Sequence, residues 1–134
     1  MGCDIHAYIE IKVDGTWHHY GPAEIKRDYD LFEYMAGVRG EVQDWPPRGL
    51  PADISVVTQL LADHEGSDGH THSWLGYDEM IKVAKYGEAN QESSWRYQPF
   101  GIWFFGNGID SWRDPEYHFQ TRIEDVRLVF WFDN

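Results

Sequence analysis

The stretch IHAYIEIKV, residues 5–13, decides the fold of this chain. Apolar residues occupy its odd positions, and more polar residues occupy the even positions, which are His6, Tyr8, Glu10 and Lys12. Strict alternation of this kind is typical of a β-strand with one buried face. The Asp14-Gly15 pair that follows suits a two-residue type I′ turn, so residues 16–20 are expected to return as an antiparallel partner.

Beyond this hairpin, hydrophobic periodicity and turn residues predict three helices and two further strands. The helices are expected over residues 28–36, from Asp53 or Ser55 onward, and over residues 77–86, and the strands over residues 102–105 and 123–132. The histidine-rich residues 63–72 between the last two helices are typical of a polar loop. This order predicts an α+β fold, with residues 1–134 forming a single globular domain.

The sheet is expected to be mainly antiparallel, built from the N-terminal hairpin and the C-terminal strand, with about three helices packed on one face. The period of two along a strand then assigns side chains to its other face. That second face would carry Asp4, His6, Tyr8, Arg127 and Trp131. It is therefore where functional residues are sought.

Composition excludes several classes of protein. The 134 residues hold 11 Lys and Arg against 23 Asp and Glu, a net charge of −12, which argues against binding duplex nucleic acid or an anionic membrane. A hydrophobic fraction of 42% is too high for a disordered chain. With Cys3 as the lone cysteine, no internal disulfide forms, and no secretion signal or membrane span is visible, so a cytoplasmic protein is expected. The sequence leaves open whether it forms a homo-oligomer.

Two pairs of residues have the spacing of metal ligands. Asp4 and His6 lie two apart at the start of a strand, and His70 and His72 repeat this spacing in the polar segment. A carboxylate and imidazoles that converge on one point suit Zn²⁺, Mn²⁺ or Fe²⁺. The alternative is that the acid and the first histidine are structural and that the loop is merely solvated.

The arginines are of interest because cations are scarce. Arg39 and Arg48 lie beside turn residues, where a guanidinium can bind a phosphate, although an ion pair with one of the many acids is the simpler explanation for either. Trp74 follows the histidine pair and is a candidate for stacking on a nucleobase. Asp133, near the chain end, is a candidate general base or further metal ligand.

Several short motifs resemble a group of small phage and prophage proteins that open with the same hexapeptide. The motifs are MGCDIH at residues 1–6, YDLF at 29–32, AGVRG at 36–40, RGLP at 48–51, HSWL at 72–75 and VFWFDN at 129–134. This resemblance implies a phage accessory protein that acts in the cytosol of a bacterial host. It implies no particular reaction.

Three functional hypotheses remain open. The first is a metal-dependent hydrolase of a phosphorylated or nucleotide-like molecule, with metal ligands Asp4, His6, His70 and His72. The second is a non-catalytic phage anti-defence protein that sequesters a nucleotide immune signal. The third is an acidic decoy that imitates DNA, which ranks last because the acids are spread along the chain with only modest clustering.

Overall fold

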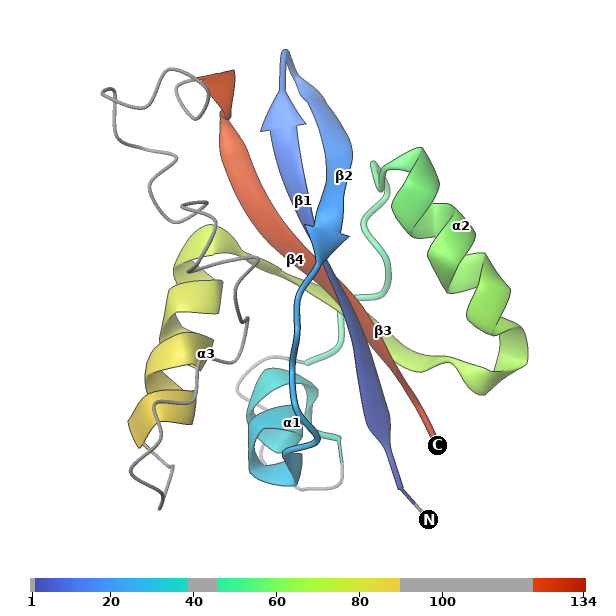
Figure 1. The fold of residues 1–134 in the computed structure, drawn as a ribbon, viewed down its shortest axis with the longest axis vertical. Helices are drawn as coiled ribbons and strands as arrows, with labels where there is room; N and C mark the ends of the chain where they lie inside the picture. The colour runs from blue at the N-terminus through green and yellow to red at the C-terminus, as the bar shows by residue number, and fades with distance from the viewer. Residues whose placement is uncertain (1, 39–45, 90–121) are drawn as a thin grey trace.

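An antiparallel sheet with the strand order β2-β1-β4-β3 forms the centre of the structure (Figure 1). The structure is a computed structural model, and it describes residues 2–38, 46–89 and 122–134. The strands are β1 (Asp4–Val13), β2 (Thr16–Pro22), β3 (His70–Gly76) and β4 (Asp125–Asp133). Although the two chain ends are far apart in sequence, β1 and β4 lie side by side as the central pair, in register from Asp4 opposite Asp133 to Lys12 opposite Asp125.

The hairpin of β1 and β2 has the predicted turn. Asp14 and Gly15 have φ values of 50° and 77°, and a type I′ turn needs positive φ at both of its central residues. Glycine adopts this conformation without strain, whereas aspartate is one of the few other residues that tolerate it. The alternation of residues 5–13 is also confirmed, since Ala7, Ile9 and Ile11 are buried in the main core.

Three α-helices and one short 3₁₀ turn flank the sheet within the described residues: α1 (Tyr29–Ala36), α2 (Val56–Glu65), η1 (Gly66–Asp68) and α3 (Tyr77–Ala89). Asp28 caps α1 by accepting a hydrogen bond from the Leu31 N–H, and Gly37 ends it with φ of 71°. Among these helices, none combines the length and the hydropathy needed to cross a membrane.

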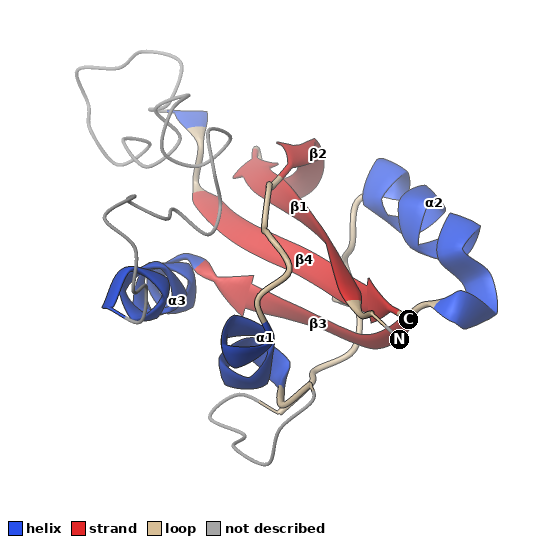
Figure 2. Ribbon diagram, turned by 60° about the horizontal axis from the view of Figure 1, so that its bottom comes forward, coloured by secondary structure: helices blue, strands red, loops and turns tan. Residues whose placement is uncertain are grey.

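The predicted α+β class is confirmed, but the helices are divided between the two faces of the sheet (Figure 2). On one face, α1 and α3 pack against the apolar residues of β1 and β4 and form the main core, which includes Phe32, Met80 and Phe130. On the other face, Ala62 of α2 packs against Val129 and Trp131, in a smaller cluster. The helix α2 therefore covers part of the face that was expected to be open.

The way α2 packs explains this difference. Its buried residues are the small Thr58 and Ala62, whereas Val56 and Leu60, on its apolar stripe, are 76% and 62% exposed. Small side chains let the helix approach the sheet closely, and His19 of β2 adds a contact of 3.0 Å from its Nδ1 to Thr58 Oγ1. Apolar periodicity alone would have placed α2 with its apolar stripe on the main core.

The strand β3 was not predicted. Residues 63–72 were expected to form one polar loop, but α2 continues to Glu65, and β3 begins at His70. The first residues of β3 do not alternate in polarity. They form a strand because they pair with β4, on the side of β4 that faces away from β1. The strand expected at residues 102–105 lies outside the described residues.

A buried ion pair links the central strands to the start of α2. Glu10 is 0% exposed and Arg127 is 4% exposed, and the Arg127 Nε–H donates to Glu10 Oε1 over 2.8 Å. The other oxygen of Glu10 accepts the backbone N–H of Ser55, the residue that directly precedes α2. The Arg127 Nη1 also bonds Asp53 Oδ1 at 2.8 Å, which holds the pKa of Asp53 below its usual value. One carboxylate and one guanidinium thus join β1, β4 and α2.

We expect Arg127→Leu to lower the free energy of unfolding by about 3–5 kcal/mol, because it leaves the Glu10 carboxylate buried without its partner. The double variant Glu10→Leu/Arg127→Leu should lose less free energy of unfolding than Arg127→Leu alone, since the uncompensated Glu10 charge is removed. Urea unfolding at pH 7 measures both values. Lys82→Met, which removes an exposed cation of α3, is the control and should change stability by less than about 0.5 kcal/mol. A loss below about 1 kcal/mol for Arg127→Leu would contradict this role for the ion pair.

Candidate metal centre

One group of side chains in the described part of the chain could hold a metal ion. It consists of His6 from β1, Glu65 from the last residue of α2 and Asp133 from β4, whose ligand atoms all lie within 4.8 Å of one another. The His6 Nε2 lies 2.8 Å from Asp133 Oδ2 and 3.3 Å from Glu65 Oε1. Each side chain is between 22% and 28% exposed, so the group is partly shielded and still open to solvent.

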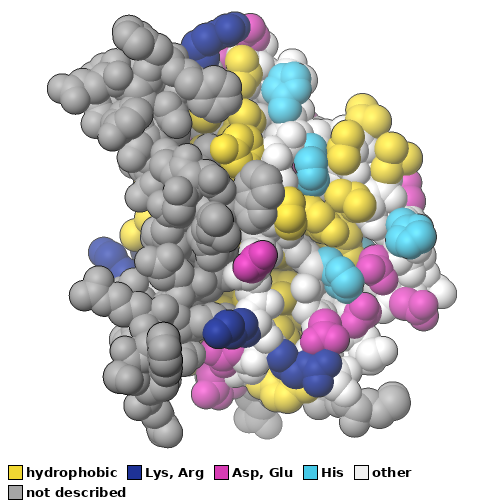
Figure 3. Space-filling view, viewed as in Figure 1, with side chains coloured by type: hydrophobic (Ala, Val, Ile, Leu, Met, Phe, Trp, Pro, Cys, Tyr) yellow, Lys and Arg dark blue, Asp and Glu magenta, His cyan; other side chains and the backbone are white. Residues whose placement is uncertain are grey.

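The strand register brings His6 and Asp133 together. His6 is paired with Trp131 and Asp4 with Asp133, so these side chains leave the sheet on the same face. In Figure 3, acidic side chains and a histidine gather at the lower right, where Figure 1 shows both chain ends. The predicted placement of Asp4, His6 and Trp131 on one face agrees with this register.

Glu65 reaches the group because the chain turns tightly after α2. A Cβ atom at Gly69 would lie 3.3 Å from the Glu65 Cβ and 3.4 Å from the Trp131 Cδ1. This spacing is tighter than most real contacts, so a glycine allows the segment after α2 to lie close against the indole. The same close approach keeps Glu65 beside the sheet.

The buried indole of Trp131 orients the imidazole of His6. The two rings stack with centroids 6.2 Å apart and planes inclined by 17°, and Trp131 is 0% exposed. His72 of β3 also stacks on Trp131, with centroids 5.9 Å apart. Because β4 runs between β1 and β3, His72 lies on the far side of Trp131 from His6. Burial, together with the nearby His70, lowers the pKa of His72, which favours the neutral form of its imidazole.

The structure does not bring together the predicted ligands Asp4, His6, His70 and His72. Both carboxylate oxygens of Asp4 accept hydrogen bonds from Arg27, each at 2.8 Å, although Asp4 is on the expected face. At Thr71 the φ of 56° and a register shift break the alternation of β3. As a result, His70 packs against Phe132 and approaches Asn134, whereas His72 packs against Trp131.

Of the two carboxylates beside His6, one was predicted from the sequence and the other was not. Asp133 was predicted to act near the metal, and the structure places it against His6. Glu65 was not predicted, because it was assigned to the polar loop, and no spacing in the sequence links it to His6. Glu65 could have been considered as a ligand only if α2 had been predicted to continue to residue 65.

The predicted ligand-binding residues lie elsewhere. Arg39 is outside the described residues. Arg48 makes a two-point ion pair with Glu79, donates to the carbonyl of Trp74 at 3.0 Å and stacks over the Trp74 indole at 4.6 Å. These contacts fix Arg48 and Trp74 against each other and against α3, so the simpler explanation, an ion pair with an acid, applies to Arg48. The hydrogen bond from Arg48 also lowers the pKa of Glu79.

The lowered pKa of Glu79 predicts a loss of stability in acid. Its folded-state pKa lies below its usual value of 4.5, so the ion pair stabilises the protein fully above about pH 4.5, and this contribution is lost as the pH falls through the lowered pKa. Because the pair is partly exposed and screened, Glu79→Gln should cost about 0.5–1 kcal/mol at pH 7. The glutamine can still accept the Gly76 N–H that Glu79 accepts at 3.0 Å. Thermal unfolding between pH 7 and pH 3 should show the melting temperatures of the unchanged protein and of Glu79→Gln converging as the pH falls. A difference in melting temperature that grows in acid would contradict this prediction.

Comparison with protein-family models, with curated proteins and with solved structures finds no match to this chain. The chemistry of the site therefore rests on its own geometry. One imidazole nitrogen and two carboxylate oxygens are a mixed set that suits Zn²⁺, Mn²⁺ or Fe²⁺. Three protein ligands leave coordination positions for water and for a substrate, as in catalytic sites.

Proposed function

We propose that this protein is a phage-encoded accessory protein that binds a divalent metal at His6, Glu65 and Asp133 and hydrolyses a phosphorylated or nucleotide-like substrate. The observation that carries this proposal is the convergence of three ligand atoms from β1, α2 and β4 within 4.8 Å. Ligands on three separate elements of a packed fold are held in place before the metal arrives. The setting, a phage gene product in the cytosol of a bacterial host, is supported by the resemblance in the opening hexapeptide and the other motifs.

A metal at this site would supply the chemistry of hydrolysis. A bound divalent ion lowers the pKa of a coordinated water toward neutrality and stabilises the charge that develops on a phosphoryl oxygen. In the protein, the stacking of His6 on Trp131 would keep Nε2 directed at the ion. Asp133 and Glu65 would balance its charge, and the second oxygen of either carboxylate could accept a proton from a coordinated water.

Arg27 is the cation best placed to meet an anionic substrate. It is bound to Asp4, which is the register partner of Asp133, so this ion pair lies on the two strands that carry His6 and Asp133. Arg27 is 49% exposed and Asp4 is 55% exposed. An exposed ion pair contributes little to stability, so a phosphate can compete for the guanidinium at small cost. In this role Arg27 replaces Arg48, which is bound to Glu79.

Metal titration tests the binding step. We expect the purified protein, without a histidine tag, to bind about one equivalent of Zn²⁺ or Mn²⁺ by calorimetry. The variants His6→Gln, Glu65→Gln and Asp133→Asn should each weaken binding by more than about tenfold, because each removes a direct ligand. Binding should also weaken as the pH is lowered, because protons compete for the imidazole and the carboxylates.

His72→Gln is the matched control, because this histidine contacts the same indole but lies outside the ligand group. It should bind the metal like the unchanged protein. The proposed metal site is wrong if none of Zn²⁺, Mn²⁺ and Fe²⁺ binds. It is also wrong if His72→Gln weakens metal binding as much as His6→Gln does.

Hydrolysis is tested separately. The metal-loaded protein is incubated with nucleoside mono-, di- and triphosphates and with cyclic nucleotides, and products are separated by chromatography. The proposal expects release of product that is lost in His6→Gln and reduced in Arg27→Gln. Recovery of a tightly bound nucleotide in unaltered form after denaturation would replace hydrolysis with sequestration of a nucleotide signal.

A further inference from the structure

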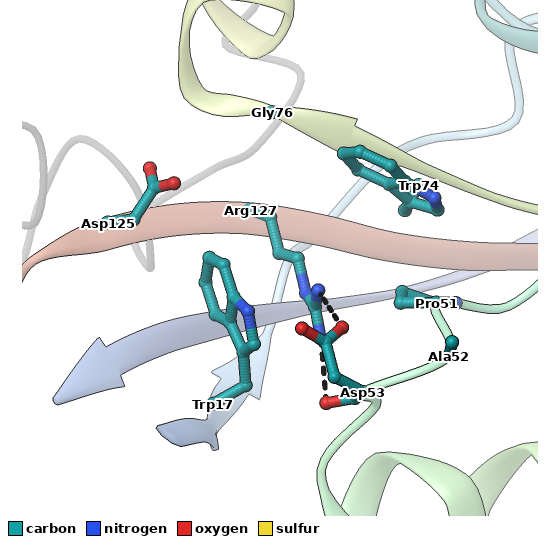
Figure 4. A pocket seen from close by; sticks show the side chains of 8 residues that line it. All are labelled: Trp17, Pro51, Ala52, Asp53, Trp74, Gly76, Asp125 and Arg127. Carbon is teal, nitrogen blue, oxygen red and sulfur yellow. Dashed lines mark hydrogen bonds and ion pairs between the residues drawn. The ribbon is translucent and has the colours of Figure 1, made fainter. Parts of the chain in front are cut away.

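The face of the sheet that α2 covers is also hollowed at the opposite end of this helix from Glu65. An open pocket of about 310 Å³ is formed by Trp17 of β2, Trp74 of β3, Arg127 and Asp125 of β4 and the segment of residues 51–53 that leads into α2 (Figure 4). This volume is at the lower end of small-molecule sites. The pocket does not depend on the metal centre, because the whole length of α2 separates the two.

Two indoles form walls of this pocket, and each already stacks on a guanidinium. The Arg127 Cζ lies 4.0 Å from the centre of the Trp17 ring, and the Arg48 Cζ lies 4.6 Å from the centre of the Trp74 ring. In Figure 4 the Arg127 side chain extends between the two indoles toward Asp53. Flat cations and aromatic faces are thus the contacts from which this part of the molecule is built.

The charges around the pocket favour a cation over an anion. Asp53 and Asp125 line it, and the one guanidinium in its lining, Arg127, is already neutralised by Glu10 and Asp53. Lys12 adds one positive charge, with its Nζ 5.9 Å from the Trp17 ring. Arg48 is neutralised by Glu79, so the carboxylates of Glu10, Asp53 and Asp125 remain against the two cations Arg127 and Lys12. The Asp53 side chain is 68% exposed despite its bond to Arg127, and a carboxylate can accept several hydrogen bonds.

We propose that this pocket binds a flat organic cation of the guanidinium class, supplied either by a free small molecule or by an arginine side chain of a partner protein. The guanidinium would stack on an indole and donate hydrogen bonds to the carboxylates of Asp53 and Asp125. A phosphate group is disfavoured there because it would meet the same carboxylates without an unpaired arginine, in a chain whose net charge is −12. A neutral nucleobase could stack on the indoles but would gain nothing from the carboxylates.

Titration with ethylguanidine and with a capped Gly-Arg-Gly peptide tests this proposal. Both are expected to shift the indole N–H signals of Trp17 and Trp74 in a saturable way, followed by ¹H–¹⁵N NMR at low salt. Trp74→Leu should weaken binding by about fivefold to thirtyfold, the range of a cation–π contact. Asp125→Asn should weaken it by up to about fivefold, and added salt should do the same for the unchanged protein.

Controls separate this site from general charge effects. Asp63→Asn removes an equal charge from the exposed side of α2, where the Asp63 side chain accepts a hydrogen bond from Gln59, and should leave binding unchanged. Tighter binding of the peptide than of ethylguanidine assigns the site to a partner protein, and equal binding assigns it to a small molecule. If Trp74→Leu does not fold, the affinities of Asp125→Asn and Asp63→Asn still test the proposal, because only Asp125→Asn should weaken binding. The proposal would be overturned if neither probe showed saturable binding. It would also be overturned if adenosine bound as tightly as ethylguanidine and its affinity did not depend on Asp125.

Discussion

Glu10 and Arg127 form the contact on which the arrangement of the α2-covered face of the sheet depends. Their charges are buried, so each needs the other, and the pairing holds β1 and β4 in one register. The second oxygen of Glu10 binds the Ser55 N–H at the start of α2. A helix anchored at its first turn has its far end placed by its length, about 15 Å for ten residues. In this way a buried carboxylate near one end of the sheet determines where Glu65 lies near the other.

This arrangement gives the face two separate ends with different chemistry. Where α2 begins, Arg127 is neutralised and flanked by indoles, so the available groups there are aromatic rings and carboxylates. Where α2 ends, an imidazole meets two carboxylates with no arginine among them, which suits a divalent ion. Between them Ala62 packs on Val129 and Trp131 and closes the middle of the face. A ligand at one end therefore has no direct contact with a ligand at the other.

The sequence predicted those features that depend on local periodicity. The alternation in residues 5–13 and the Asp14-Gly15 turn determine the hairpin, and the same period of two placed His6 on one face with Trp131. What it could not predict depends on long-range packing or on a single backbone angle. Glu65 joins the site only through the way α2 lies on the sheet, and the positive φ of Thr71 turns His70 and His72 to different faces. A two-residue spacing indicates a shared face only while the strand stays regular.

The acidity of the chain also constrains how it can bind phosphate. Every arginine in the described ranges is paired with a carboxylate: Arg27 with Asp4, Arg48 with Glu79, Arg122 with Asp14 and Arg127 with Glu10 and Asp53. The pairs of Arg48 and Arg127 are at least partly buried and join separate elements, so releasing either guanidinium would weaken the fold. Only the pairs of Arg27 and Arg122 are exposed enough to open at little cost, and of these only Arg27 is bound to Asp4, the register partner of Asp133. Under the proposed function, and within the described residues, a phosphorylated substrate would therefore depend for its charge balance mainly on a bound metal ion, so that metal binding and substrate binding at this site would be coupled.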